Sequence, residues 1–410
     1  MDLIYQLGIR FYTLVARLAA PFHEKARFWH RGRQLTFPYL REQIDGTSPV
    51  IWVHCASLGE FEQGRPLIEA IKKQQPGFKI LLTFFSPSGY EVRKNYNQAD
   101  YICYLPADTP RNARRFVELV QPRMVFFIKY EFWKNFISEL NRKKIPLYLV
   151  SGIFRPGQLF FKKGIRARWY RGLLKGIEHF FVQNQQSADL LAGIGFENST
   201  VTGDTRFDRV AEIAANRKDL PLVEQFKGNS KLIVAGSSWQ PDEEILAEYL
   251  KVNKSVKLVV APHEVKETNI KRLLGLFPEK AVRYSEAKGD LSEYRILVID
   301  SIGILSSIYR YAGLAYIGGG FGVGIHNTLE AAIYNIPVIF GPNYLRFQEA
   351  VELVRRELAF PVANAGELTS RLDRLISDEN RLAEIARGCE QFMTENIGAT
   401  QLVLSNVFAG

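Results

Sequence analysis

Short apolar runs alternate with segments of helical periodicity along the chain, and this alternation constrains the fold more than any other feature. The runs span residues 50–54, 79–85, 101–105, 124–128, 147–150, 180–183 and 200–202, then 231–235, 257–261, 296–299, 314–317 and 337–340. Buried strands separated by helices form parallel sheets that helices cover on both faces. The sequence therefore predicts an α/β fold.

The chain is too long for a single core, because 410 residues exceed the usual size of one domain. A charged, helix-like stretch, "DRVAEIAANRKDLPLVEQFKGNS", ends in a Pro- and Gly-containing link near Leu220. We expect a Rossmann-like domain over residues 34–220 and a second one over 221–410. The two doubly wound domains are expected to face each other across a cleft.

Residues 1–33 form a separate N-terminal element. Polar side chains recur at helical spacing on one face of the first twenty residues, and the rest are mostly apolar: Asp2, Gln6, Arg10, Thr13 and Arg17. Two arginines count against a membrane-spanning helix. A basic collar follows, made of Lys25, Arg27, Arg31 and Arg33. We expect an amphipathic helix lying on the cytoplasmic side of a membrane; a helix docked on the protein's own core and a single-pass signal anchor are the alternatives.

A second basic segment, residues 155–177, contains seven cations and no acid, with Trp169 and Tyr170 among them. Aromatic residues among cations are typical of single-stranded nucleic-acid binding or of a lipid headgroup zone. A solvated helix face with buried aromatics is equally compatible. The N-terminal helix favours lipid, so we expect a membrane partner and no nucleic acid.

Several classes of chemistry lack their motifs. Three widely separated cysteines do not suit a disulfide framework or a zinc site, and the sequence contains no D-x-D. The segment "GGGFGVG" matches neither the dinucleotide-binding nor the P-loop spacing. We therefore expect no metal and no cofactor.

Polar and Gly-rich loops follow the predicted strands at their carboxyl ends, where open parallel sheets bind ligands. These positions are Glu60, Glu131, Arg206, Ser237, Ser238, Pro262, His263, 300–303 and 318–330, the last including Gly319 and Gly320. They predict a lined cleft, the usual place of an enzyme site.

The last of these loops has two interpretations. Its glycines allow close approach of a ligand, and Asn327 is expected to cap a helix through Leu329 and Ile333, whose N-terminus suits phosphate. Glu330 is then placed to accept hydrogen bonds from sugar hydroxyls. Alternatively, Glu330 only favours the positive helix end.

Glu60 also has two interpretations. Ser57 and Glu60 match a capping box, but Pro66 favours a helix that starts near Arg65. We expect Glu60 in a loop, ionised and able to take a proton, and Glu62 solvated.

Together, "SLGEFEQGRPL", "EFWKN", "GDTRFD", "AGSSWQPDEE" and "GGGFGVGIHNTLEAA…PVIFGP" resemble the 3-deoxy-D-manno-octulosonic acid (Kdo) transferases of lipopolysaccharide synthesis, in family order as far as about Phe347. The resemblance implies a GT-B fold, CMP-Kdo as donor, lipid IVA as acceptor and attachment to the cytoplasmic face of the bacterial inner membrane.

The resemblance also implies roles for residues. Glu60 is similar to the family's catalytic base, and Glu131 and Arg206 to its transition-state stabilisers. Nucleotide contacts fall on Pro262, His263, Ile302, Gly303, Ile304, Asn327, Thr328, Leu329 and Glu330. Four features depart from the family pattern: His263 stands for an arginine, Arg206 for a lysine, "GVGIHN" for a loop richer in glycine and histidine, and "DSIGIL" lacks an acid after its glycine.

The implied reaction is metal-independent transfer of Kdo to lipid IVA with inversion. A GT-B transferase that uses a UDP-sugar is the nearest alternative, and a membrane-associated nucleotide-binding scaffold without turnover is the other.

Overall fold

The computed structural model describes residues 1–277 and 280–408, and these fall into two compact units. The first unit comprises Met1–Arg209 together with the residues from Ile397 on, and the second comprises Val210–Asn396. This differs from the predicted division at Leu220. The C-terminal helix returns to the first unit because Val403 and Leu404 are buried in the core on one face of its sheet.

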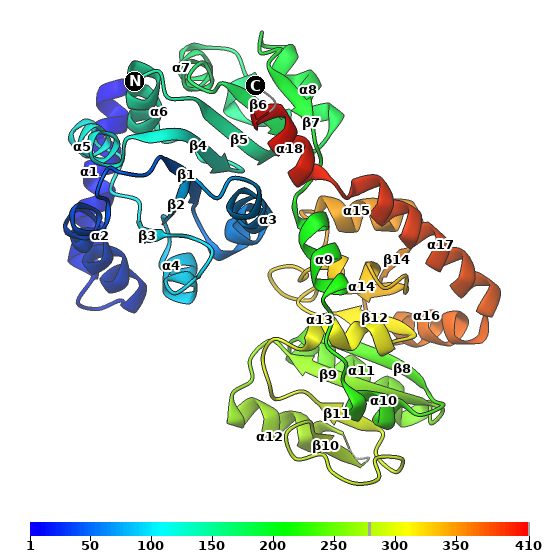
Figure 1. Ribbon diagram of the computed structural model, residues 1–410. Coiled ribbons are helices and arrows are strands. Elements are labelled where there is room, and N and C mark those ends of the chain that lie inside the picture. The colour runs from blue at the N-terminus through cyan, green and yellow to red at the C-terminus, as the bar shows by residue number, and fades with distance from the viewer. Residues whose placement is uncertain (278–279, 409–410) are drawn as a thin grey trace. The chain divides into compact units, whose positions relative to one another are not determined.

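The first unit contains a seven-stranded parallel sheet with helices on both faces (Figure 1). Its strands are β1 (Val50–Cys55), β2 (Lys79–Phe84), β3 (Tyr101–Tyr104), β4 (Pro122–Ile128), β5 (Leu147–Gly152), β6 (His179–Val182) and β7 (Ser199–Val201). Its helices are α1 (Asp2–Ala19), α2 (Glu24–Gln43), α3 (Leu58–Gln74), α4 (Pro87–Arg93), α5 (Pro110–Val120), α6 (Lys134–Arg142), η1 (Leu159–Phe161), α7 (Ile165–Leu174), α8 (Gln185–Ala192), α9 (Arg206–Ala215), which continues past the division, and α18 (Ala399–Phe408).

The second unit repeats this architecture. Its strands are β8 (Lys231–Ser238), β9 (Val256–Pro262), β10 (Ala281–Arg283), β11 (Ile296–Val298), β12 (Leu314–Ile317), β13 (Val338–Phe340) and β14 (Ala359–Pro361). Its helices are α10 (Pro221–Lys227), α11 (Gln240–Val252), α12 (Glu267–Leu276), α13 (Leu305–Ile308), η2 (Tyr309–Tyr311), α14 (Leu329–Ala332), α15 (Gln348–Arg355), α16 (Ala365–Ser377) and α17 (Glu379–Asn396).

Strand order places one switch point in each sheet. The first sheet runs β3-β2-β1-β4-β5-β6-β7, so the order reverses between β1 and β4. The second runs β10-β11-β9-β8-β12-β13-β14, so it reverses between β8 and β12. Ligands of doubly wound sheets bind beyond the carboxyl ends of strands at such points. The loops after β1, β4, β8 and β12 are therefore the places to look for a site.

The predicted α/β fold is confirmed, and each predicted apolar run corresponds to a strand. Strands β10 and β14 were not predicted; each is three residues long, and they form opposite edges of the second sheet. Edge strands this short contain too few apolar positions to give a run.

The helix after β1 was predicted to start near Arg65 with Glu60 in a loop before it, and this prediction is wrong. Helix α3 begins at Leu58 and passes through Pro66, with a complete capping box at its N-terminus. A proline inside a helix costs about 3 kcal/mol, but Pro66 and Leu67 lie on the buried face of the helix. Gly64 brings that face within contact of Cys55 on β1. Close packing on the sheet therefore outweighs the lost backbone hydrogen bond.

Candidate functional site

Two carboxylates mark the switch point of the first sheet. Glu60 lies in the first turn of α3, directly after β1, and Glu131 lies in the loop after β4. Burial, and next the negative charge of Glu131, raise the pKa of Glu60 to about 7, although backbone N–H groups and Lys129 act in the opposite direction. The expectation of a fully ionised Glu60 is therefore wrong near neutral pH. Its pKa instead suits a group that accepts a proton there.

The N-terminal cap of α3 fixes the position of Glu60. The Glu60 Oε2 atom accepts a hydrogen bond from the backbone N–H of Ser57 at 3.1 Å, and the Ser57 hydroxyl accepts from the N–H of Glu60 at 3.5 Å. The Glu60 side chain thus caps helix α3, and the same side chain is the candidate proton acceptor. Glu62, expected to be solvated, instead pairs with Arg93 at 2.9 Å.

A buried hydrogen-bond network holds Glu131. Its Oε2 atom accepts from the indole Nε1–H of Trp133 at 2.5 Å and lies 3.2 Å from Nε2 of His54. The other ring nitrogen of His54 lies 2.8 Å from the hydroxyl of Thr83. Because Glu131 is only 8% exposed, these contacts fix its carboxylate rather than leave it to solvent. Sequence reasoning missed His54 and Trp133, although Trp133 belongs to the "EFWKN" motif.

Lys129 was also missed, although it precedes these groups directly at the end of β4. It adopts a left-handed backbone conformation with φ of 70°, which is rare for a side chain other than glycine and costs of order 1–3 kcal/mol. The backbone bends at Lys129, between β4 and Glu131. No sequence pattern signals such a conformation.

The positive charge of Arg206 is paired with the carboxylate of Asp204. Its guanidinium donates to Oδ2 of Asp204 through Nε at 2.9 Å and Nη2 at 2.7 Å. Gln63 of α3 also donates to Asp204. Burial opposes ionisation of Asp204, but the charge and hydrogen bonds of Arg206 outweigh it and lower its pKa. Arg206 is thus tied to α3, the helix that carries Glu60.

In the second unit, a ring stack follows the ends of β8 and β9. His263 stacks on Trp239 at 4.6 Å and on His326 at 4.5 Å between ring centroids. Burial and then the charge of His263 lower the pKa of His326 to about 4. The neutral Nε2 atom of His326 therefore accepts from the indole N–H of Trp239 at 3.2 Å. Trp239 was not predicted, although it lies within a quoted motif, and His326 was included only as part of the predicted segment 318–330.

The two serines after β8 have different surroundings. Ser237 adopts a left-handed conformation with φ of 53° at the switch point. Ser238 is buried and donates to Glu243, while its carbonyl accepts from the backbone N–H of His263 at 2.9 Å. Their contact with nucleotide stays a prediction.

The glycines after β12 pack against the protein's own backbone. A Cβ atom on Gly320 would lie 2.5 Å from the backbone nitrogen of Gly341, and one on Gly319 would lie 2.5 Å from the carbonyl of Gly324. The N–H of Gly319 donates to buried Asp242 at 2.9 Å. These glycines are required by the tight loop itself, whatever binds nearby.

Helix α14 is shorter than predicted, because it ends at Ala332. Asn327 is not the N-cap residue that we expected, because Thr328 occupies that position without a side-chain cap hydrogen bond. Asn327 precedes it, accepts the N–H of Leu329 at 3.1 Å, and donates from its amide to Oε1 of Glu330 at 3.1 Å. The hydroxyl of Thr328 is buried without a hydrogen-bond partner. Ile302, at 86% exposure, lies on the open loop after β11 with Gly303 and Ile304.

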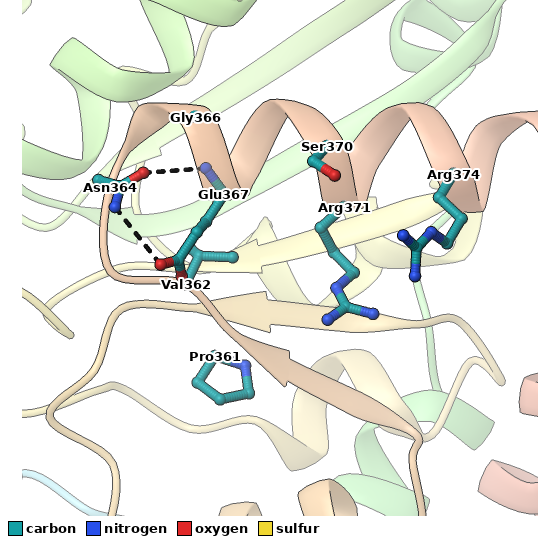
Figure 2. A pocket seen from close by; sticks show the side chains of 8 residues that line it. All are labelled: Pro361, Val362, Asn364, Gly366, Glu367, Ser370, Arg371 and Arg374. Carbon is teal, nitrogen blue, oxygen red and sulfur yellow. Dashed lines mark hydrogen bonds between the residues drawn. The ribbon is translucent and has the colours of Figure 1, made fainter.

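A hollow of about 490 Å³ lies elsewhere, between β14 and α16 (Figure 2). It is lined by Pro361, Val362, Asn364, Gly366, Glu367, Ser370, Arg371 and Arg374. None of the predicted site residues is among them. Over residues 1–277 and 280–408, no three His, Cys, Asp or Glu side chains gather as they would around a metal ion.

Comparison with known proteins identifies relatives. Residues 25–209 match the profile of the 3-deoxy-D-manno-octulosonic-acid transferase (kdotransferase) family. The resemblance to the Kdo transferases is confirmed. A Kdo transferase of Aquifex aeolicus is 29% identical over 345 residues, which cover 82% of this chain and 89% of that protein. The Kdo transferase of Haemophilus influenzae is 25% identical, covering 86% of this chain and 85% of that protein.

A bifunctional glycosyltransferase/methyltransferase of Fusobacterium nucleatum is 26% identical, and the match covers 84% of this chain but 55% of that protein. Solved structures share the fold. A putative UDP-N-acetylglucosamine 2-epimerase from Listeria monocytogenes aligns with a TM-score of 0.61 at 14% identity, over 88% of this chain and 96% of that one. The calicheamicin glycosyltransferase CalG4 aligns with a TM-score of 0.58 at 12% identity, over 88% and 98%. The fold of this chain is therefore of the GT-B type.

Proposed function

We propose that this protein is a glycosyltransferase that moves Kdo from CMP-Kdo to a hydroxyl group of lipid IVA, with inversion and without a metal ion. The names of its relatives support Kdo as the transferred sugar. The observation that carries the reaction is Glu60, a carboxylate at a switch point whose pKa of about 7 lets it accept a proton at neutral pH.

In the proposed mechanism, the acceptor oxygen attacks the anomeric carbon of Kdo while its proton passes to the Glu60 carboxylate. The bond between that carbon and the phosphate oxygen breaks, and the electron pair leaves with CMP. Glu131, fixed by Trp133 and His54, places negative charge near the anomeric carbon as positive charge develops there. Arg206 helps to position Glu60, because it pairs with Asp204, which also accepts a hydrogen bond from Gln63 on the same helix as Glu60.

The second unit is the proposed donor domain. We assign donor binding to the loops after β8, β9, β11 and β12, which carry Ser237, Ser238, the segment around His263, residues 302–304 and the segment 327–330. Glu330 is already oriented by Asn327, which supports the proposal that it accepts hydrogen bonds from the donor's hydroxyl groups.

Helix α1 supports a membrane partner because none of its residues is buried against the domain. Two polar side chains contact the domain, where Tyr5 donates to Asp108 at 2.5 Å and Gln6 donates to Asn135 at 2.7 Å. Its apolar face is open, with Leu3 71% and Phe11 69% exposed.

The basic segment 155–177 meets the start of this helix, where Trp169 donates to Asp2 at 2.5 Å. None of the helices formed by the described residues is long and apolar enough to cross a bilayer. We propose that α1 lies on the cytoplasmic face of the inner membrane, with its apolar side in the lipid.

Mass spectrometry of lipid IVA incubated with the protein and a CMP-Kdo supply tests the reaction. We expect a mass increase of one or more Kdo units, and unchanged lipid IVA together with bound CMP would favour the scaffold. Thermal unfolding with CMP or UDP tests the donor class. Protection by CMP is expected, and protection by UDP alone would favour a UDP-sugar transferase.

A further inference from the structure

The hollow between β14 and α16 carries two guanidinium groups. Arg371 and Arg374 line it, and Figure 2 shows both side chains on the side of α16 that faces β14. A second hollow of about 480 Å³ shares Pro361 and both arginines with the first. The two arginines therefore lie where the hollows meet.

Helical spacing explains the polar lining of the hollow. Residues three and four positions apart lie on one face of a helix, and α16 places four lining residues at such spacing: Gly366, Ser370, Arg371 and Arg374. The buried side of the helix carries Leu368, Leu372 and Leu375. Helix α16 thus turns an apolar face to the core and a cationic face to the hollow.

The ring of Phe360 orients Arg371. The guanidinium carbon of Arg371 lies 4.7 Å from the centroid of this ring, which belongs to β14 and is itself buried. Arg371 is partly buried, whereas Arg374 is exposed. A cation–π contact attracts the charge to the face of the ring, but it accepts none of the hydrogen bonds that a guanidinium donates. Arg371 is thus oriented with its N–H groups available to an acceptor.

Within residues 1–277 and 280–408, the two arginines have no counter-ion. Other arginines of the second unit are paired, such as Arg356 with Glu352 at 2.8 Å and Arg381 with Glu357 at 3.0 Å. A guanidinium fork is best satisfied by a carboxylate or a phosphate. The hollow therefore presents two cations that lack the partner they favour.

The other two acids that line the hollows lie at helix N-termini. The carboxylate of Glu367 accepts hydrogen bonds from the N–H of Ala363 at 2.9 Å and from the amide of Asn364 at 3.4 Å (Figure 2). Asp378 accepts the N–H of Arg381 at 2.9 Å, at the start of α17. The positive end of a helix offsets part of the charge of such a carboxylate. These acids are thus placed to cap helices rather than to neutralise the two arginines.

The hollow lies at the same edge of the second sheet as the proposed donor loops, but outside them. Pro361 is in register with Phe340 of β13, and Phe340 is in register with Ile317 of β12. Neighbouring strands are about 4.8 Å apart, so Pro361 lies roughly 10 Å from Ile317, after which the loop 318–330 begins. None of the residues proposed to bind the donor lines the hollow.

An added peptide strand does not suit this edge of the sheet. Strand β14 has three residues and ends in Pro361, which has no N–H to donate to a further strand. Proline on an edge strand is a common protection against such pairing. The polar lining therefore favours a small anion over a peptide.

We propose that the hollow between β14 and α16 binds a small phosphate monoester, at a site separate from that of the donor. Two guanidinium forks on one helix face suit the oxygens of one dianionic phosphate, and the hydroxyl of Ser370 beside them can donate a further hydrogen bond. The site does not depend on the proposed function, because its residues belong neither to the donor loops nor to the first unit.

Calorimetric titration with inorganic phosphate tests the proposal. The titration is made at constant ionic strength with saturating CMP, so that phosphate does not enter the proposed donor site. We expect the wild type to bind phosphate, and the double variant Arg371→Met with Arg374→Met to bind it roughly 10- to 100-fold more weakly, since charge-assisted hydrogen bonds are lost. The corresponding double lysine variant should recover part of the affinity.

Arg387→Met, which removes an exposed arginine from α17 outside the hollow, should keep the wild-type affinity. Absence of phosphate binding by the wild type overturns the proposal without any need for a folded variant. Equal affinities of the wild type and the double methionine variant overturn it as well.

Flotation with phosphatidylglycerol vesicles separates a soluble phosphate from a lipid headgroup. The wild type and the double methionine variant are expected to float equally. Loss of flotation in the variant would assign the two arginines to the bilayer and overturn the small-molecule site. A protein that transfers Kdo but binds no phosphate beside CMP would refute this site alone, and one that binds phosphate without transferring Kdo would refute only the proposed function.

Discussion

Glu131 raises the pKa of Glu60 across the switch point between β1 and β4. After burial, the negative charge of Glu131 is the largest contribution to the pKa of about 7 at Glu60. The two carboxylates are far apart in the sequence. Their pairing follows from the strand order, which sets β1 beside β4.

Replacing Glu60 with Gln should lower the rate of transfer by roughly 10²–10⁴-fold, because an amide cannot take up the proton of the attacking hydroxyl group. Donor binding and melting temperature should stay near wild type, since glutamine also completes a capping box. Single-turnover transfer and thermal unfolding measure the two effects. Glu62→Gln, on the same helix and paired with Arg93, is the control. Near-full turnover in Glu60→Gln would disprove the base assignment.

The rate of transfer should depend on the ionisation of Glu60. We expect kcat/KM to rise with pH and to level off above about 7, where the base is ionised. Glu131→Gln removes a negative charge beside Glu60, so the remaining activity should level off at lower pH. The pH profiles of both proteins measure this shift. An identical inflection in the two would show that Glu131 does not act on the catalytic base.

The stability of the protein should also depend on the ionisation of Glu60, but it should fall rather than rise with pH. Between the ordinary pKa of 4.5 and the folded value of about 7, the folded state holds more protons at Glu60 than the unfolded state does. The contribution of Glu60 to the free energy of unfolding therefore falls as pH rises through this window. Glu60→Gln should remove that part of the pH dependence. Denaturant titrations of both proteins at pH 4.5 and pH 7.5 check it, and parallel changes in the two would contradict it.

The open face of α1 should determine membrane binding and contribute little to folding. The double variant Leu7→Glu with Phe11→Glu should lose flotation with phospholipid vesicles, because both side chains are more than half exposed. The melting temperature should stay within a few degrees, since exposed substitutions usually change stability by about 0.5 kcal/mol or less. Val252→Glu, an exposed apolar position of the second unit, is the control. A large fall in melting temperature would show that this face packs on the protein.

Glu330→Gln should weaken binding of CMP-Kdo by about 1–3 kcal/mol, because the bound donor would lose hydrogen bonds to a charged acceptor. Acceptor affinity should not change, because α14 belongs to the second unit. Calorimetry with each ligand separately measures both. Unchanged donor affinity would show that Glu330 has a local structural role, as in its contact with Asn327, and would disprove its assignment to the donor.

Local sequence determined which segments become buried strands and which of the loops after them contain candidate site residues. Each apolar run became a strand, because a buried parallel strand needs little more than a short continuous apolar segment. Glu60, Glu131 and Arg206 could be found in the same way, since they follow strand ends in recognisable motifs. The polar spacing in residues 1–21 likewise predicted an amphipathic helix, but not which of its faces meets the protein.

Tertiary structure decided what depends on neighbours distant in the sequence. The start of α3 was predicted wrongly because the packing of Pro66 and Gly64 against β1 cannot be read from a local pattern. The pKa of Glu60 depends on burial and on a charge from another strand. The return of α18 to the first unit depends on which core its apolar residues enter. A cation such as Arg33 looks solvated in the sequence, and only the folded chain surrounds it with rings from three separate elements.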